Sequence, residues 1–572
     1  MIFRLTCLLL ALASFWLCVS PVHAKGSTDA VQITTDHFRL SGVMVPEDGI
    51  AMISELERYR AALLEVHGLP ADTPDRRVDI YIVSDPDIFD VLGVGENFVA
   101  LYSPTLAGPR ALINGSLGVQ AFAYASDPAA ELEAVLRQNL RHEYGQHFIN
   151  NFLPVPHPTW IGEGLAEYYA GYDELPDGGY RFGVPQATSV VALSYPVQGW
   201  RDMRAVLASV HSIAPETTPR RSRPTAKGWI TAPDGTSLFY AQSWALVHWM
   251  MNRSGQTDIP GGLAALAGLS DRLLAHDSPP PAELSPPPTF RQQRQNAKAK
   301  AVVIGRTAQL ELGLPLQPPG GAVRIDGTLE QVLFDYIAGD LPVLSRPAPH
   351  NRPNFSLDLQ ILTPAQAAAL QYRQMALTAG PRGLTDSRMK TLRREAQADP
   401  ALNTSLKISD AALQYAGGDT QSAIDLIEAI RVENPTLSPE EQALDLAFSI
   451  AKFRISDFKT PEAMRARLRP VLDRYPNDIP YLVMMAETGI GDLIRANATL
   501  PPEVREALAK ISAMDLERIY PRAVLPLANL YLQQEDYARV LPLLHRVRPY
   551  LHDSQEVDQM ISQIGFILED GP

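Results

Sequence analysis

RHEYGQHFINNFLPVPHPTWIGEGLAEYY, residues 141–169, combines residue types that suit a metal-dependent hydrolase. A catalytic zinc ion needs three protein ligands and an open position for water, with a carboxylate close enough to take the water's proton. His142 can supply a ligand and the adjacent Glu143 can serve as the general base. We therefore expect this stretch to lie on two neighbouring helices around a metal.

The second ligand position is the unusual feature of the stretch. On a regular α-helix the residue four positions after His142 lies only about 40° around the axis, and that residue is Gln146. His147 lies about 140° around and would need a π-bulge, which Gly145 makes plausible, to turn toward the metal. We expect His147 to be the second ligand, with the Gln146 amide oxygen as the alternative.

The third ligand is expected from the segment that follows. Glu163 stands near the start of an apolar periodic run, PTWIGEGLAEYYAG, after a connection that contains proline. Glu167 lies one turn later and could orient a histidine through its second ring nitrogen. The predicted metal ligands are therefore His142, His147 and Glu163.

The motifs HEY, PTWIGEGLAEYY and the later FYAQSWALVHW together resemble the bacterial peptidase-MA-like domains of the gluzincin class over roughly residues 35–260. The resemblance implies a zincin-like fold, Zn²⁺ bound by His142 and Glu163, and Glu143 as general base. It also implies an oxyanion-stabilising group on a later helix, for which Tyr240 is the candidate. His248 on the same helix is expected to be a packed residue.

Gln146 departs from the pattern of this family at a ligand position. The hexamer HEYGQH is similar in spacing alone to the dipeptidyl peptidase III family, where the second histidine comes one residue later. That similarity implies that a longer spacing is chemically workable. It leaves open whether His147 or Gln146 binds the metal, or whether the site is inactive.

The pattern outside the motif predicts an α+β domain. DHFRLSG, RRVDIYIVS, NFVALYS and PRALING are typical of strands, and residues 49–68 and 128–151 have helical spacing. We expect a peptidase-like domain over residues 25–275, followed by a Pro-rich basic linker over 276–300. Residues 301–395 carry no pattern that assigns a role.

Residues 396–572 are predicted to form an all-α region that resembles tetratricopeptide repeats. GDTQSAIDLIEAIRVENP and YLQQEDYARVLPLLHRV follow the same scheme of small, acidic and apolar positions. Such helix pairs stack into an array with a concave face, so we expect a protein partner there. A plain helical bundle is the alternative.

The N-terminus predicts export. Residues 1–24 contain one arginine, an apolar run and small residues before a cleavage point after Ala24, which is typical of a signal peptide. Both cysteines, Cys7 and Cys18, lie inside it, so the mature chain would contain no disulfide. We expect a periplasmic or secreted protein with no stable membrane span after cleavage.

Charge excludes one class of partner. The formal net charge is −14, and removal of Arg4 with the signal takes it to −14 − 1 = −15. Nucleic-acid binding relies on clustered Lys and Arg, so it is not expected. The leading hypothesis is an exported zinc metallopeptidase acting on peptides or proteins; the alternative is a catalytically impaired pseudo-peptidase that binds proteins in the cell envelope.

Overall fold

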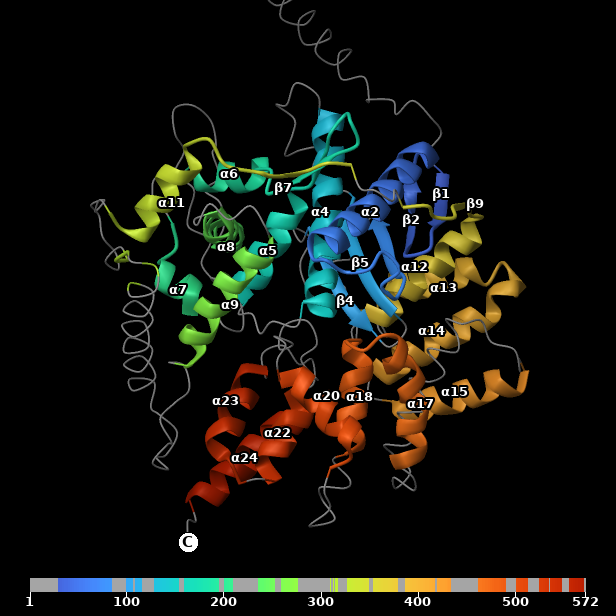
Figure 1. Cartoon of the computed structure of the whole chain (residues 1–572). Helices are drawn as coiled ribbons and strands as arrows, with labels where there is room; N and C mark the ends of the chain where they lie inside the picture. The colour runs from blue at the N-terminus through green and yellow to red at the C-terminus, as the bar shows by residue number, and fades with distance from the viewer. Residues whose placement is uncertain are drawn as a thin grey trace, which may run out of the picture.

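The computed structural model has a mixed α+β fold (Figure 1). It describes residues 29–84, 99–105, 108–115, 128–153, 159–194, 200–208, 235–252, 259–275, 309, 312, 314–316, 327–348, 353–378, 386–416, 419–433, 461–489, 500–512, 524–533, 535–547 and 555–569. The predicted signal peptide and the predicted linker at 276–300 lie outside these residues.

A six-stranded mixed sheet forms the centre of the N-terminal part, in the order β4-β5-β3-β2-β1-β9. β2 pairs in parallel with β3 and β3 with β5, whereas the remaining neighbours are antiparallel. The strands are β1 (Asp29–Thr34), β2 (Phe38–Met44), β3 (Val78–Val83), β4 (Ala100–Thr105), β5 (Gly108–Asn114) and β9 (Asp358–Ile361). The four strands expected from the sequence correspond to β2, β3, β4 and β5.

One face of the sheet is covered by α2 (Pro46–Val66) and α4 (Pro128–Phe152). The predicted row of Val78, Ile80 and Ile82 is buried on this face. Alternate residues of a strand point to the same face of the sheet. Burial of the apolar side chains on that face stabilises the fold through the hydrophobic effect. The helical spacing of α2 is confirmed as well, because Ile53, Leu56, Tyr59 and Leu63 are all buried in the same core.

The opposite face of the sheet is covered by segments from much later in the sequence. Val83 and Leu112 pack there against α12 (Pro364–Thr378), α13 (Ser387–Ala396) and α14 (Asn403–Ala416). β9, just before α12, completes the sheet beside β1. Residues 301–395, which the sequence left unassigned, therefore supply an edge strand and a covering helix to the N-terminal sheet.

A second group of elements packs beside α4. It contains a three-stranded sheet in the order β6-β7-β8 and the helices that surround α8 (Figure 1). Its members are β6 (Asp173–Glu174), β7 (Tyr180–Phe182), β8 (Leu344–Arg346), α5 (Thr159–Ala170), α6 (Ala187–Leu193), α7 (Met203–Ala208), α8 (Gly235–Asn252), α9 (Ile259–Ala275) and α11 (Leu329–Ile337).

The C-terminal part is helical, as expected. After η3 (Pro400–Leu402) and α14 the described elements are α15 (Thr420–Glu433), α17 (Pro461–Arg474), α18 (Ile479–Thr488), α20 (Pro502–Ser512), α22 (Val524–Gln533), α23 (Tyr537–Val547) and α24 (Gln555–Glu569). α14 packs on α15 and α22 on α23, each pair with its own apolar cluster. Within the described residues, no helix has both the length and the apolar character needed to cross a membrane.

Candidate functional site

The candidate site lies where α4, α5 and α8 meet, and Gly145 and Gly164 lie at the contacts between these helices. A Cβ added at Gly145 would lie 3.4 Å from the Ala166 Cα on α5. A Cβ added at Gly164 would lie 2.6 Å from the Ser243 carbonyl oxygen on α8, a separation that real Cβ atoms do not show. Close packing of α5 on α8 therefore requires a glycine at position 164.

α4 is an uninterrupted α-helix from Pro128 to Phe152. The expected π-bulge near Gly145 is therefore absent, and Gly145 instead faces Ala166 and the Tyr59 hydroxyl. A regular helix places His142 and Gln146 on one face and turns His147 away from them. The register of α4 decides which side chains meet Glu163.

His142, Gln146 and Glu163 form a closed triangle of polar contacts. Gln146 Nε2 lies 3.0 Å from His142 Nε2 and donates a hydrogen bond to Glu163 Oε2, also 3.0 Å away. His142 Nε2 and Glu163 Oε2 are 3.2 Å apart. Glu163 is only 1% exposed, and the Gln146 amide donates a hydrogen bond to its buried carboxylate. The side-chain amide of Gln146 thus bridges the two residues predicted to bind a metal.

Glu167 and Tyr240 both lie beside His142. His142 Nδ1 lies 3.2 Å from Glu167 Oε1. The Tyr240 ring packs edge-on against the imidazole, with 6.0 Å between ring centroids and 89° between planes. Glu143, the predicted general base, follows His142 on α4 and is 5% exposed. The structure therefore brings His142, Glu163, Glu167 and Tyr240 together.

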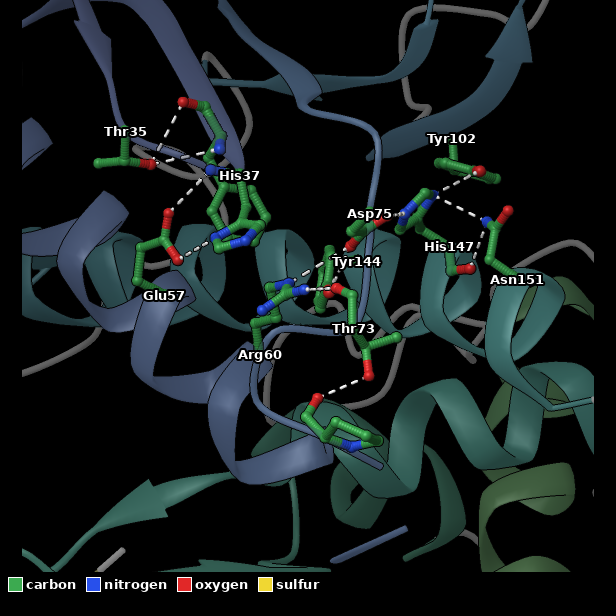
Figure 2. A network of polar contacts seen from close by, with 12 residues as sticks. Thr35, His37, Glu57, Arg60, Thr73, Asp75, Tyr102, Tyr144, His147 and Asn151 are labelled. Atoms are coloured by element: carbon green, nitrogen blue, oxygen red, sulfur yellow. Dashed lines mark hydrogen bonds and ion pairs between the residues drawn. The ribbon is translucent and has the colours of Figure 1, made fainter. Parts of the chain in front are cut away.

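His147 does not join this group, which corrects its predicted role as second ligand. Figure 2 shows its ring turned toward Asp75 and Tyr102. His147 Nε2 lies 2.8 Å from Asp75 Oδ1, and Nδ1 lies 2.9 Å from the Tyr102 hydroxyl. The reason is the helical rotation of about 140° over five residues, with no bulge to reverse it.

Asp75 is the centre of a buried polar network on this second face of α4. Its other oxygen accepts a hydrogen bond from the Tyr144 hydroxyl at 3.1 Å and lies 3.4 Å from Arg60 Nε (Figure 2). Burial alone would raise the pKa of Asp75, but His147, Arg60 and Tyr144 together hold that pKa below its ordinary value. No pattern in the sequence singles out Asp75, because its partners lie on two separate helices, Arg60 on α2 and Tyr144 with His147 on α4.

A cleft of about 200 Å³ opens beside this network, between the sheet domain and the C-terminal helices. Asp75, His147 and Tyr102 line it from one side, and the loop before α18 lines it from the other. Arg76 Nη1 donates to Asp478 Oδ2 at 2.7 Å across the boundary. Asn477 Nδ2 donates to the Asn151 carbonyl at the end of α4, at 2.6 Å. These contacts fix the helical part against α4.

His248 is a packed residue, as expected. It is completely buried on α8, with Nδ1 at 2.9 Å from the Tyr336 hydroxyl and Nε2 at 2.8 Å from the Gly183 carbonyl oxygen. Burial lowers the pKa of His248 to about 4, so the ring is neutral at pH 7. Both ring nitrogens have protein partners, which leaves none for a ligand.

The donor set at His142 does not fit a catalytic zinc ion. Zinc sites of this kind use three His, Asp or Glu ligands, and here His142 and Glu163 supply two. Within the part of the chain that the structure describes, no group of three or more His, Cys, Asp or Glu side chains is arranged to hold a metal. The third corner is the Gln146 amide, which directs its nitrogen, a hydrogen-bond donor and no metal ligand, toward both residues in this arrangement.

Comparison of the chain with family models, with curated proteins and with solved structures finds no match.

Proposed function

We propose that this protein is a catalytically impaired pseudo-peptidase with a zincin-like domain, which acts as a protein-binding module in the cell envelope. The observation that carries the proposal is the position of the Gln146 amide nitrogen, 3.0 Å from both His142 Nε2 and Glu163 Oε2. A hydrogen-bonded side chain occupies the corner at which a peptidase of the gluzincin class would use a second histidine.

The hydrogen-bond inventory supports a stable metal-free arrangement. The Gln146 amide has two hydrogens, and its two neighbours are the Glu163 carboxylate and a ring nitrogen of His142. If the amide donates to His142 Nε2, that nitrogen carries no proton, and the proton of the neutral ring is on Nδ1, which faces Glu167. A hydrogen bond to a buried carboxylate contributes about 1.5–3 kcal/mol, so the amide stabilises Glu163 without a cation.

The helical C-terminal part supports the binding role. α14 packs on α15 and α22 on α23, and the second helix of each pair lies in one of the two repeat-like segments. Ala423 and Ile424 are buried at predicted packing positions, and Asp419 accepts a hydrogen bond from the Ser422 backbone at the start of α15. We assign tetratricopeptide-like stacking and partner binding to this part as one element of the proposal.

The competing function is the active zinc metallopeptidase. It would require the Gln146 amide to rotate so that its oxygen, rather than its nitrogen, points toward His142 and Glu163. A neutral amide oxygen is a weaker zinc donor than imidazole, and without a cation the rotated oxygen would face the Glu163 carboxylate. The unrotated amide satisfies the same groups directly, and we therefore favour the pseudo-peptidase.

The test is peptide hydrolysis together with binding. The purified mature chain is assayed on a permanently unfolded, carboxymethylated protein, with binding followed by fluorescence anisotropy and cleavage by electrophoresis. The proposal expects binding without cleavage, both with and without added Zn²⁺.

Two variants make the test specific. Gln146→His restores the four-residue spacing and is expected to gain zinc-dependent cleavage, which Glu143→Gln in the same background should abolish. Zinc-dependent cleavage by the unmodified chain that Glu143→Gln removes would exclude the pseudo-peptidase. Absence of binding would exclude the proposed binding role.

A further inference from the structure

The outer edge of the six-stranded sheet carries an unusual row of apolar side chains. β9 is the last strand, and among the described strands none pairs with its outer side. Leu357, Leu359 and Ile361 are 40%, 38% and 55% exposed. Leu359 and Ile361 lie directly opposite the buried Ile33 and Val31 of β1, so they continue the apolar row of the core past the edge of the sheet.

Among the described strands, none pairs with the backbone groups on the outer side of β9. In an antiparallel pair, alternate residues direct both N–H and C=O to the partner strand. The Leu362 N–H donates to the Ala30 carbonyl of β1, so even-numbered residues of β9 face β1. Leu357, Leu359 and Ile361 therefore direct their N–H and C=O groups outward.

The strand is held in place at both ends. Before it, the Ser356 hydroxyl donates to Asp36 Oδ1 at 2.7 Å. After it, Thr363 and Gln366 exchange side-chain and backbone hydrogen bonds at the start of α12. A fixed strand loses little further conformational entropy when it pairs, so β9 is pre-organised as an edge for another strand.

β9 also lacks the devices that protect natural edge strands. Such edges carry lysines, prolines or bulges, because an open apolar edge recruits other strands. The residues from Leu357 to Ile361 contain neither lysine nor proline, and their one charge, Asp358, lies on the opposite face from the apolar row. The exposed edge is therefore suited to pairing.

We propose that β9 pairs antiparallel with β9 of a second copy of this chain, about a two-fold axis at Leu359. The sequence LDLQI is self-complementary in this register. Leu359 meets its own copy, Leu357 meets Ile361, and Asp358 on the other face meets Gln360 rather than itself. A shift by one residue would place apolar side chains opposite polar ones.

The interface is expected to be weak because it is small. A single short strand pair buries less than the roughly 1,200 Å² of typical stable complexes. We therefore expect a dimer with a dissociation constant on the order of micromolar.

The test is sedimentation velocity of the mature chain from about 1 to 100 µM, a range that brackets that constant. Leu359→Lys and Leu359→Glu each place like charges opposite one another at the two-fold axis, so each alone is expected to weaken dimerisation at least tenfold. An equimolar mixture of the two should dimerise again, because the charges become complementary. Val43→Lys, at an exposed valine on the opposite face of β2, is the matched control and should dimerise like the unmodified chain.

Ile361→Pro is the second probe, because it removes an outward N–H without touching the ladder to β1. Unchanged melting temperatures of all variants would show that they fold. A monomer at every concentration, or variants that dimerise as well as the unmodified chain, would overturn the proposal. Failure of the Lys and Glu variants to associate with each other would contradict the two-fold axis at Leu359.

Discussion

The two faces of α4 use histidine in opposite ways. On the face toward α5, His142 contacts Gln146 and Glu163 in a triangle of polar side chains. On the face toward the sheet, His147 contacts Asp75 and Tyr102 in a buried polar network. His147, which the sequence suggested as the second metal ligand, is therefore part of the buried network around Asp75.

This difference shows that ligand spacing must be interpreted with the helix register. A shift of one residue rotates a side chain by about 100°, which moves it from the site to the core. On the His142 face a neutral amide compensates a buried carboxylate, whereas on the His147 face an arginine and a histidine compensate Asp75. Each face can be perturbed separately.

The largest effect is expected from Asp75→Ala. It leaves Arg60 and His147 without their shared carboxylate in the core, and removing one partner of a buried charge pair costs about 3–5 kcal/mol. The free energy of unfolding measured with denaturant should fall by that amount. Asp173→Ala, at the exposed pair with Arg181, is the control and should change it by less than about 1 kcal/mol. Equal effects would contradict a structural role for the network.

The next effect is expected from Gln146→Ala. Glu163 would keep its burial and lose an amide donor, which should destabilise the fold by about 1.5–3 kcal/mol. The measurement is denaturant unfolding in the presence of a chelator. A Gln146→Ala variant as stable as the parent would mean that the amide does not compensate Glu163.

The Asp75 network should also make stability depend on acid. The folded-state pKa of Asp75 lies below its unfolded value of about 3.9, so its contribution is complete above that value and is lost as pH falls through the folded pKa. The stability difference between the parent and Asp75→Asn should therefore shrink as pH falls below about 4. A difference that grows in acid would reverse the assigned sign.

The smallest changes in stability are expected from alanine substitutions at Gly164 and Gly145, and the two should differ. Gly164→Ala forces α5 away from the Ser243 carbonyl and should cost about 1–3 kcal/mol. Gly145→Ala meets only ordinary contacts and removes a helix-disfavouring residue, so its effect should lie between zero and a gain of about 1 kcal/mol. Thermal unfolding of both variants measures this, and a Gly145→Ala variant less stable than Gly164→Ala would contradict the helix spacings.

Much of the sheet domain was predictable because its patterns are local. Alternation in β3 and the helical period of α2 each bury one face, and short-range sequence contains that information. Glu163, near the start of an apolar periodic segment, was named from that pattern, and Tyr240 was named from the family resemblance; both lie near His142.

The remainder depends on contacts that sequence spacing does not encode. β9 joins the sheet from more than 300 positions after β1, and Asp75 meets His147 from 72 positions away. Gln146 and His147 are adjacent and lie about 100° apart around the helix, so the choice between them depends on whether α4 is regular. The presence of Gly145 in the sequence did not answer that question. Gly145 stands in a regular helix, in ordinary contact with α5, where the sequence suggested a bulge.

Zinc content after dialysis, measured by mass spectrometry on three forms of the chain, tests the central claim most directly. With Gln146 in the second ligand position, the parent and His147→Ala should both retain no stoichiometric zinc, whereas Gln146→His should retain about one ion per chain. Stoichiometric zinc in the parent that His147→Ala removes would contradict this account.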